Sequence, residues 1–198
     1  MIESIFAGLL IAMGGAMYLA IGGVVGAIMF SLGLLTILHF QLRLFTGKAG
    51  LLLSGDIRPV RLGLIWCGNL LGTGIGAMLC LLVSWSDKHG FMQGATNIMN
   101  TRISNMWFEN IILGIFCGLL MYVAVTAYET KPWVTVMCVS AFILSGFNHC
   151  IADMFYWCVA LANPDFRPGL AAVMILCTTV GNIIGCNLIP ACEKMRRR

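Results

Sequence analysis

The most constraining feature of this sequence is a run of 39 residues, from Ser4 to Leu42, without a single formally charged side chain. A helix needs about 20 apolar residues to cross a bilayer, so the run is long enough for two crossings. Gly22 and Gly23 near its middle predict a tight connection between them. Only 10% of the chain is charged, against about a quarter in soluble domains. The sequence therefore predicts an all-α membrane protein.

Charged or proline-bearing stretches divide the rest of the chain into further apolar spans. After two spans within residues 4–47, we expect spans over 62–86 and 110–128, then two that open at Pro132 and Pro168, because proline suits the first turn of a helix. The last of these is expected to end before Glu193. Residues 87–109 are expected to be a long polar connection. Six spans fit one transmembrane channel domain over residues 1–198.

The two halves of the chain repeat one another. The motif Gly68-Asn69-Leu70-Leu71-Gly72 returns as Gly181-Asn182-Ile183-Ile184-Gly185, and Gly15-Ala16-Met17-Tyr18 is echoed by Gly118-Leu119-Leu120-Met121-Tyr122. Small residues at this spacing predict close packing of helices. The repeat halves cover about residues 1–86 and 107–192. A unit with three crossings inserts upside down the second time, so we predict two inverted three-helix repeats.

Polar and glycine residues interrupt the second and fifth spans. The expected helix breaks are Phe45 and Gly47 in the second span, and Ser145 and Gly146 in the fifth. Asn148, His149 and Asp153 follow the second break, and an acid at membrane depth costs roughly 2.5–3.5 kcal/mol, which usually marks a pathway. Half-helices that start at the breaks would aim their positive ends at the midplane and favour an anion there. Thr46 and His149 would supply side-chain donors, and His149 a proton.

The distribution of basic residues predicts the orientation in the membrane. Six spans place both termini on one side, where seven basic residues then lie against three on the other. The seven are Arg58, Arg61, Lys131, Lys194, Arg196, Arg197 and Arg198; the three are Lys88, Arg102 and Arg167. By the positive-inside rule we expect a multi-pass protein of the cell (inner or plasma) membrane with both termini in the cytoplasm.

Other classes of function find little support in the sequence. Nine cysteines without a C-x-x-C motif are expected to be packing residues, so we predict no metal and no cofactor. The basic residues form no groove for nucleic acid. An intramembrane hydrolase using Ser145 and His149 is disfavoured, because no Gly-x-Ser-x-Gly motif surrounds Ser145. A channel for neutral solutes or weak bases such as urea or ammonia remains open as an alternative, and so does a purely structural protein.

Six motifs in order along the chain resemble the formate/nitrite transporter family. They are Phe30-Ser31-Leu32-Gly33-Leu34, Leu44-Phe45-Thr46-Gly47, Gly68-Asn69-Leu70-Leu71-Gly72, Leu113-Gly114-Ile115-Phe116-Cys117, residues 145–155 and Gly181-Asn182-Ile183-Ile184-Gly185. The resemblance covers nearly the whole chain. It implies an aquaporin-like protomer in a lipid bilayer, assembled as a homopentamer with one pore per protomer.

The resemblance also implies a function and a set of site residues. Small monovalent anions such as formate, nitrite, acetate, lactate or hydrosulfide would pass, often with a proton. The substrate pathway would contain Thr46, Asn148, His149, Asp153 and Arg102. Two apolar constrictions would be built from Phe30, Leu34, Leu44 and Phe142, and would strip water from the ion.

Several positions depart from the family pattern. Arg43 and Asn148 replace glutamates, Asp153 replaces an asparagine, and Gly118 stands where the family has an asparagine. Asp153 follows His149 by four residues, so we expect it to orient the imidazole. Arg43 and Asp153 are expected to form a compensating pair.

Overall fold

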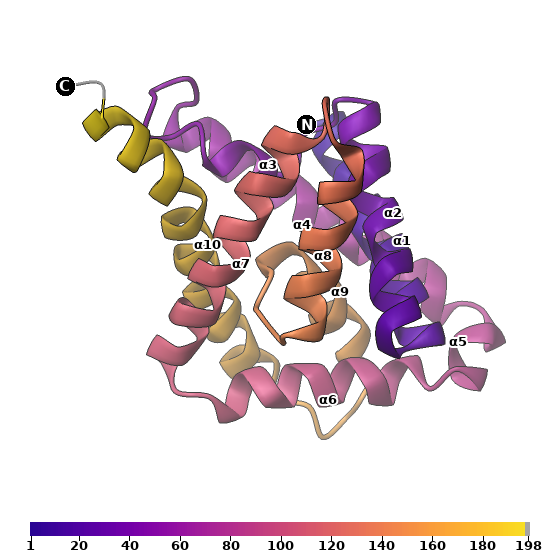
Figure 1. Cartoon of the computed structure of the whole chain (residues 1–198). Coiled ribbons are helices and arrows are strands. Elements are labelled where there is room, and N and C mark those ends of the chain that lie inside the picture. Colours follow the sequence, from indigo (N-terminus) through magenta and orange to yellow (C-terminus); the bar gives the residue numbers. More distant parts are fainter. Residues whose placement is uncertain (197–198) are drawn as a thin grey trace.

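The computed structural model describes residues 1–196, which form a bundle of helices (Figure 1). Ten helical segments follow one another in this part of the chain: α1 (Ile2–Ile21), α2 (Gly23–His39), α3 (Phe45–Ala49), α4 (Pro59–Leu81), α5 (Ser84–Lys88), α6 (Phe91–Ser104), α7 (Trp107–Ala127), α8 (Pro132–Leu144), α9 (Cys150–Ala160) and α10 (Pro168–Arg196). Arg197 and Arg198, which entered the charge count above, lie outside the described residues.

Four helices are long and apolar enough to cross a membrane: α1, α4, α7 and α10. Helices α2, α8 and α9 are apolar but shorter. The first residue and the end of α10 lie at the same end of the bundle, called here the terminal end (Figure 1). Helix α1 starts at this end, whereas α7 starts at the opposite end, beside α6 (Figure 1). The two halves of the chain thus run in opposite directions.

The repeated glycine motifs bring two pairs of helices into backbone contact. A Cβ atom on Gly72 of α4 would overlap the Ile5 carbonyl oxygen of α1, and one on Gly185 of α10 would overlap the Ile115 carbonyl oxygen of α7. The predicted close packing is confirmed. It fixes α1 against α4 and α7 against α10, so each half of the chain has its own rigid pair of helices.

Most predicted helix boundaries are confirmed, and two expectations are wrong. Gly22 and Gly23 both have positive φ, 68° and 55°, and join α1 to α2. Pro132 and Pro168 begin α8 and α10. However, α10 continues through Glu193 to Arg196, because a helix that leaves the apolar region keeps its backbone bonds, and basic residues suit its C-terminus.

The second correction concerns residues 87–109, which were expected to be a polar connection. They contain the whole of α6, which lies across the end of the bundle away from the termini (Figure 1). Phe91, Ala95 and Met99 are completely buried, and they recur at helical spacing beneath a polar outer face. Charge content alone concealed this amphipathic pattern.

Candidate functional site

Two short non-helical segments meet inside the bundle, one between α2 and α3 and one between α8 and α9. Each contains a residue with positive φ, Gln41 at 53° and Gly146 at 71°. The residue that follows each of these donates a hydrogen bond back to the preceding helix. Leu42 N–H donates to the Ile37 carbonyl and Phe147 N–H to the Phe142 carbonyl, both at 2.9 Å. The two segments therefore make the same turn.

Of the four residues predicted to break the helices, two lie outside helices and two lie within one. Ser145 and Gly146 lie between α8 and α9. Phe45, in contrast, is the first residue of α3, and Gly47 lies inside that helix. The earlier interruption covers residues 40–44, because Gln41 takes the left-handed conformation, which is unusual for a residue with a side chain. A glycine inside a helix costs only about 1 kcal/mol, so Gly47 does not break α3.

An asparagine from a long helix holds each interruption. Asn69 of α4 accepts from Phe45 N–H at 2.8 Å and donates to the carbonyl of Arg43 at 3.0 Å. Asn182 of α10 accepts from Cys150 N–H and donates to the carbonyl of Asn148, both at 2.9 Å. Both asparagine side chains are fully buried. They satisfy backbone groups that the interrupted helices leave unpaired.

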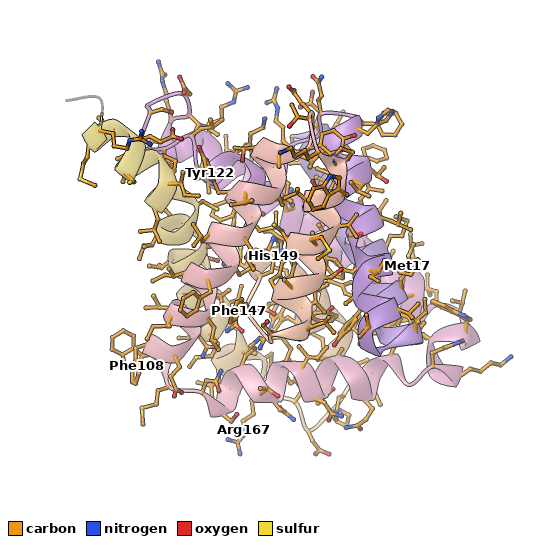
Figure 2. The ribbon with its side chains drawn as sticks, viewed as in Figure 1. Met17, Phe108, Tyr122, Phe147, His149 and Arg167 are labelled. Carbon is orange, nitrogen blue, oxygen red and sulfur yellow. The ribbon has the colours of Figure 1, made fainter. Side chains whose placement is uncertain are left out.

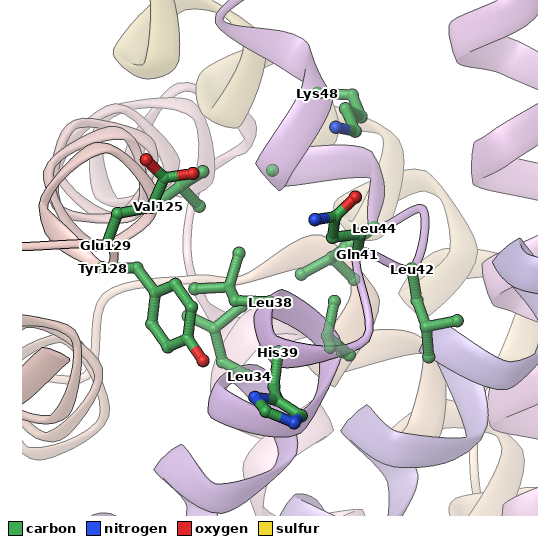
Figure 3. Close-up of a pocket in the computed structure, with 12 residues that line it drawn as sticks. Leu34, Leu38, His39, Gln41, Leu42, Leu44, Lys48, Val125, Tyr128 and Glu129 are labelled. Atoms are coloured by element: carbon green, nitrogen blue, oxygen red, sulfur yellow. The ribbon is translucent and has the colours of Figure 1, made fainter.

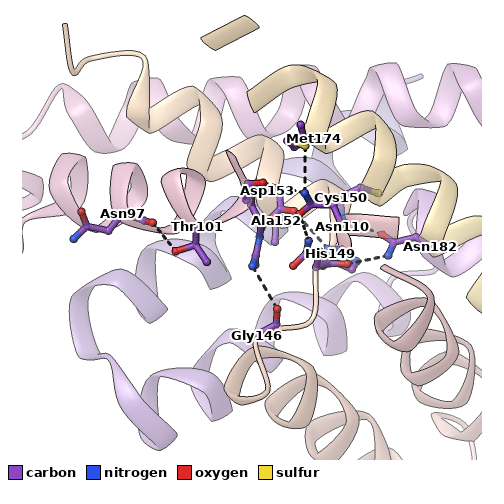
Figure 4. Close-up of polar contacts among 12 residues, drawn as sticks. Asn97, Thr101, Asn110, Gly146, His149, Cys150, Ala152, Asp153, Met174 and Asn182 are labelled. Atoms are coloured by element: carbon purple, nitrogen blue, oxygen red, sulfur yellow. Dashed lines mark hydrogen bonds and ion pairs between the residues drawn. The ribbon is translucent and has the colours of Figure 1, made fainter. Parts of the chain in front are cut away.

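His149 and Thr46 join the two halves at the centre. Thr46 Oγ1 and His149 Nε2 lie 2.9 Å apart, and both residues are buried. His149 is also the N-cap of α9, because its Nδ1 accepts from Ala152 N–H at 3.2 Å. A backbone N–H only donates, so the neutral imidazole carries its proton on Nε2 and donates it to Thr46. Figure 2 shows His149 in the middle of the bundle, and Figure 4 shows it together with Ala152 and Cys150 of α9.

Apolar side chains surround this polar pair. The Phe142 ring stacks on the imidazole of His149, with centroids 5.5 Å apart and planes inclined by 17°. Phe30 meets Phe142 edge-on, at 6.2 Å between centroids. Leu34, one turn after Phe30 on α2, and Leu44 at the start of α3 are both buried. The structure thus brings together the four residues predicted as constrictions.

A cavity lies on each side of these apolar residues. The terminal cavity, about 500 Å³, is lined by Leu34 and Leu44 together with Lys48, Tyr128 and Glu129, and Figure 3 shows this lining. The opposite cavity, about 160 Å³, is lined by Phe30, Phe142 and His149 together with Tyr18, Tyr156, Arg102 and Asp153. Phe30 and Leu34 on one face of α2 thus separate two cavities that open at opposite ends of the bundle.

Two expectations about Asp153 are wrong. Its Oδ1 lies 3.4 Å from Nε of Arg102 on α6, and both imidazole nitrogens are engaged by Thr46 and Ala152, so Asp153 does not orient His149. Arg43 is not its partner either, because Arg43 Nε pairs with Glu3 at 2.5 Å. The expectation assumed that two residues four apart lie on one face of a helix. His149 is the N-cap of α9 and is not within that helix, so the assumption does not apply.

The positions of Asn148 and Gly118 follow from packing. Asn148 is fully buried and donates to Oδ1 of Asn110 at 2.7 Å; Asn110 was missed by the sequence reasoning. A Cβ atom on Gly118 would overlap the Asn182 carbonyl oxygen, so no asparagine fits there unless α7 moves away from α10. The roles of Asn69 and Asn182 could have been predicted from the sequence. Each is an asparagine within an apolar span, and a polar side chain in a membrane helix requires hydrogen-bond partners.

Comparisons with known proteins agree with this architecture. A family model described as formate/nitrite transporter matches residues 1–193. The chain is 30% identical to formate channel FocA of Escherichia coli strain K12 over 198 residues, 89% of this chain and 70% of that protein. It is 30% identical to formate channel FocA of Haemophilus influenzae over 146 residues, 66% of this chain and 51% of that protein.

Solved structures show the same fold. One described as a pentameric formate channel with formate bound superposes with a TM-score of 0.82 at 22% identity, covering 99% of this chain and 95% of that chain. Another, described as an FNT family ion channel, gives 0.79 at 20% identity and covers 99% and 88%. The fold and the buried polar centre define a multi-pass membrane protein of the channel or transporter class.

The chain belongs to the formate/nitrite transporter family. That family consists of channels and transporters and not of enzymes, so the hydrolase hypothesis is excluded. In the structure His149 contacts Thr46 and Ala152 and makes no hydrogen bond with Ser145 among the described contacts.

Proposed function

We propose that this protein is a transmembrane channel for small monovalent anions of the formate, nitrite, hydrosulfide, acetate or lactate class. The observation that carries the proposal is the buried Thr46–His149 pair, which lies between apolar side chains with a cavity on either side. The relatives named formate channels support formate as the first anion to test.

The proposed path crosses the bundle along its long axis. Helices α2 and α3 would act as one interrupted span and α8 and α9 as another, which completes six crossings in two inverted repeats. The opposite directions of α1 and α7 support this topology (Figure 1). Both termini would be cytoplasmic, in keeping with the basic residues Arg58, Arg61 and Lys131 near the terminal end.

The centre suits a small anion that has lost its water. Because His149 Nε2–H donates to Thr46 Oγ1, the Thr46 hydroxyl hydrogen is left to donate to a passing anion. The first amide of α9 is capped by a neutral asparagine, and the one acidic side chain in the first turn of that helix, Asp153, is paired with Arg102, so the positive end of α9 can attract an anion. Phe30, Phe142, Leu34 and Leu44 would exclude hydrated ions, as apolar constrictions do in other channels.

Proton assistance belongs to the proposal, because a neutral acid avoids most of the cost of moving a charge through an apolar constriction. The imidazole's part would be to donate a hydrogen bond at Nε2. We further propose a homopentamer with one path per protomer, which the solved pentameric relative supports. Native mass spectrometry of the detergent-solubilised protein would reveal any other stoichiometry.

The test is flux in proteoliposomes that contain wild-type protein or His149→Ala. We expect formate flux in wild type that rises as pH falls and is lost in the variant, with urea and ammonia excluded. His39→Ala is the control, because His39 lines the wide terminal cavity and takes no part in the central pair. Flux of urea or ammonia alone, unchanged by His149→Ala, would contradict the anion proposal and favour a channel for neutral solutes.

A further inference from the structure

The cavity opposite the terminal end contains a buried carboxylate with an unused oxygen. The Asp153 side chain is 2% exposed, and its Oδ1 has one long contact, 3.4 Å to Arg102 Nε. Its Oδ2 is buried and has no hydrogen-bond partner. An ionised carboxylate offers about four acceptor sites, and buried polar atoms are normally paired. The unpaired Oδ2 therefore requires an explanation, either a proton or a visiting ligand.

His149 is poorly arranged to supply a proton from the same cavity. Nδ1 accepts from Ala152 N–H, so a second ring proton at Nδ1 would face a donor and break the N-cap of α9. Nε2–H already donates to Thr46, and its loss from a neutral ring would leave an imidazolate. The hydrogen bonds of His149 thus hold one neutral form, which favours a fixed donor over a group that gains and loses protons.

The other groups that face Asp153 are few. Arg102 comes from α6, Tyr18 from α1 and Tyr156 from α9, and His149 is the N-cap of α9; all four line the same cavity. Two thiols lie near, Cys117 on α7 and Cys150 on α9. Helix α8 contributes only Phe142 and Ile143 to the lining, and no residue of α4 or α10 belongs to it. Among the described groups Asp153 is therefore the one carboxyl in this cavity.

Arg102 is free to bind more than Asp153. Its second contact is from Nη1 to the Gly146 carbonyl oxygen, also at 3.4 Å. A guanidinium has five N–H donors, so three remain, and its side chain is 12% exposed in the cavity. An anion that enters from this end would meet Arg102 and the unpaired Asp153 oxygen together, before the Phe30–Phe142 constriction.

We propose that Asp153 exchanges a proton with a weak-acid anion held by Arg102, and that the resulting neutral acid crosses the constriction. This inference rests on the proposed function. On entry the anion binds the Arg102 guanidinium, the O–H bond at Asp153 Oδ2 breaks, and the proton forms an O–H bond on the substrate oxygen. Asp153 is left ionised beside Arg102 and regains a proton from a hydronium ion of the solvent that enters the cavity, leaving water. In the opposite direction Asp153 accepts the substrate's proton and the anion leaves.

The test compares formate with nitrate, the anion of a strong acid that takes up no proton in the usable pH range. Proteoliposomes would contain wild type, Asp153→Asn, Asp153→Glu or Asp165→Asn; Asp165 is exposed and serves as the matched control. In wild type, Asp153→Glu and Asp165→Asn we expect formate flux to rise as pH falls. In Asp153→Asn we expect that rise to vanish, with acid-side formate flux at least about tenfold lower, the low end for loss of a proton-transfer group. Nitrate flux should be the same in wild type and Asp165→Asn, should show no rise on the acid side in any of the four proteins, and should fall less than formate flux in Asp153→Asn.

A rise of formate flux in Asp153→Asn equal to that of wild type would overturn the inference, and so would equal losses of formate and nitrate flux. Wild-type protein that carries neither anion would instead overturn the proposed function. If Asp153→Asn fails to assemble, infrared spectra of wild type with isotope-labelled aspartate decide. The other aspartates, Asp56, Asp87 and Asp165, are exposed and lie outside this cavity. We expect one labelled carboxylic-acid band that changes when formate is added; its absence at every pH would refute the proposal.

Discussion

Replacing Asn182 with leucine should displace the central site as well as weaken the fold. Asn182 makes three hydrogen bonds of 2.9 Å, to Cys150 N–H and to the carbonyls of Gly114 and Asn148. Gly114 lies within α7 and keeps its helical partner. Cys150 N–H and the Asn148 carbonyl flank His149 at the interruption and have no other partner among the described contacts.

The expected loss of unfolding free energy follows from these two backbone groups, which the substitution leaves without hydrogen-bond partners. Each buried polar group left without a partner costs about 1–3 kcal/mol, so Asn182→Leu should lose roughly 2–6 kcal/mol of unfolding free energy. The assay is reversible unfolding from mixed micelles by a denaturing detergent, followed by tryptophan fluorescence, with formate flux measured on the same preparations. Asn100→Leu is the matched control, because Asn100 is exposed on α6. We expect the control to behave as wild type.

The outcome that refutes this reasoning is an Asn182→Leu protein with the stability and flux of Asn100→Leu. Backbone groups at the interruption would then find other partners, and the asparagine would be a packing residue only. Asn182→Asp provides a second check. It keeps an acceptor for Cys150 N–H but loses both donated hydrogen bonds, so we expect it to lose stability and flux as well.

Three further predictions test the packing, the constriction and the surface charges. Gly72→Ala should push α4 away from α1 and lower the thermal midpoint of unfolding. Gly63→Ala, at an open position on α4, should instead stabilise the helix by about 0.5–1 kcal/mol. If both variants lowered the thermal midpoint, the contact-based argument would be contradicted. Phe142→Ala should widen the path, raising lactate flux relative to formate flux in the same vesicles; an unchanged ratio would remove Phe142 from the constriction. Glu3→Gln should cost under about 1 kcal/mol, because the Arg43–Glu3 pair is 36% and 51% exposed, and a larger loss in denaturant unfolding would count against that estimate.

The later interruption could be predicted from sequence and the earlier one could not. Gly146 has positive φ, and glycine is the residue that takes this conformation most readily. At the equivalent turn the chain uses Gln41, which no composition rule singles out. The visible glycine, Gly47, was chosen instead and proved helical. The position of a glycine does not predict a helix interruption where tertiary contacts impose the backbone conformation. Here those contacts are the hydrogen bonds of Asn69 with Arg43 and Phe45.

The partners of the charged residues were likewise beyond the sequence. Arg102 was expected on the pathway from a resemblance, and it does line the cavity next to His149. Its pairing with Asp153 depends on α6 lying across the bundle, and the charge content of residues 87–109 concealed the amphipathic pattern of that helix. Charge balance suggested Arg43 for Asp153 instead, but Arg43 pairs with Glu3.

The sequence by itself determined that this protein lies in a membrane, that its helices are apolar and that its two halves repeat one another. Hydrophobicity, the positions of proline and glycine, and a repeated motif are local properties, and they act wherever the chain lies. Only the tertiary structure decided which nitrogen of His149 carries its proton, which oxygen of Asp153 stays unpaired, and where the two cavities lie. These depend on groups far apart in sequence, such as Thr46 and His149, because a hydrogen bond is fixed by distance and direction and not by residue type.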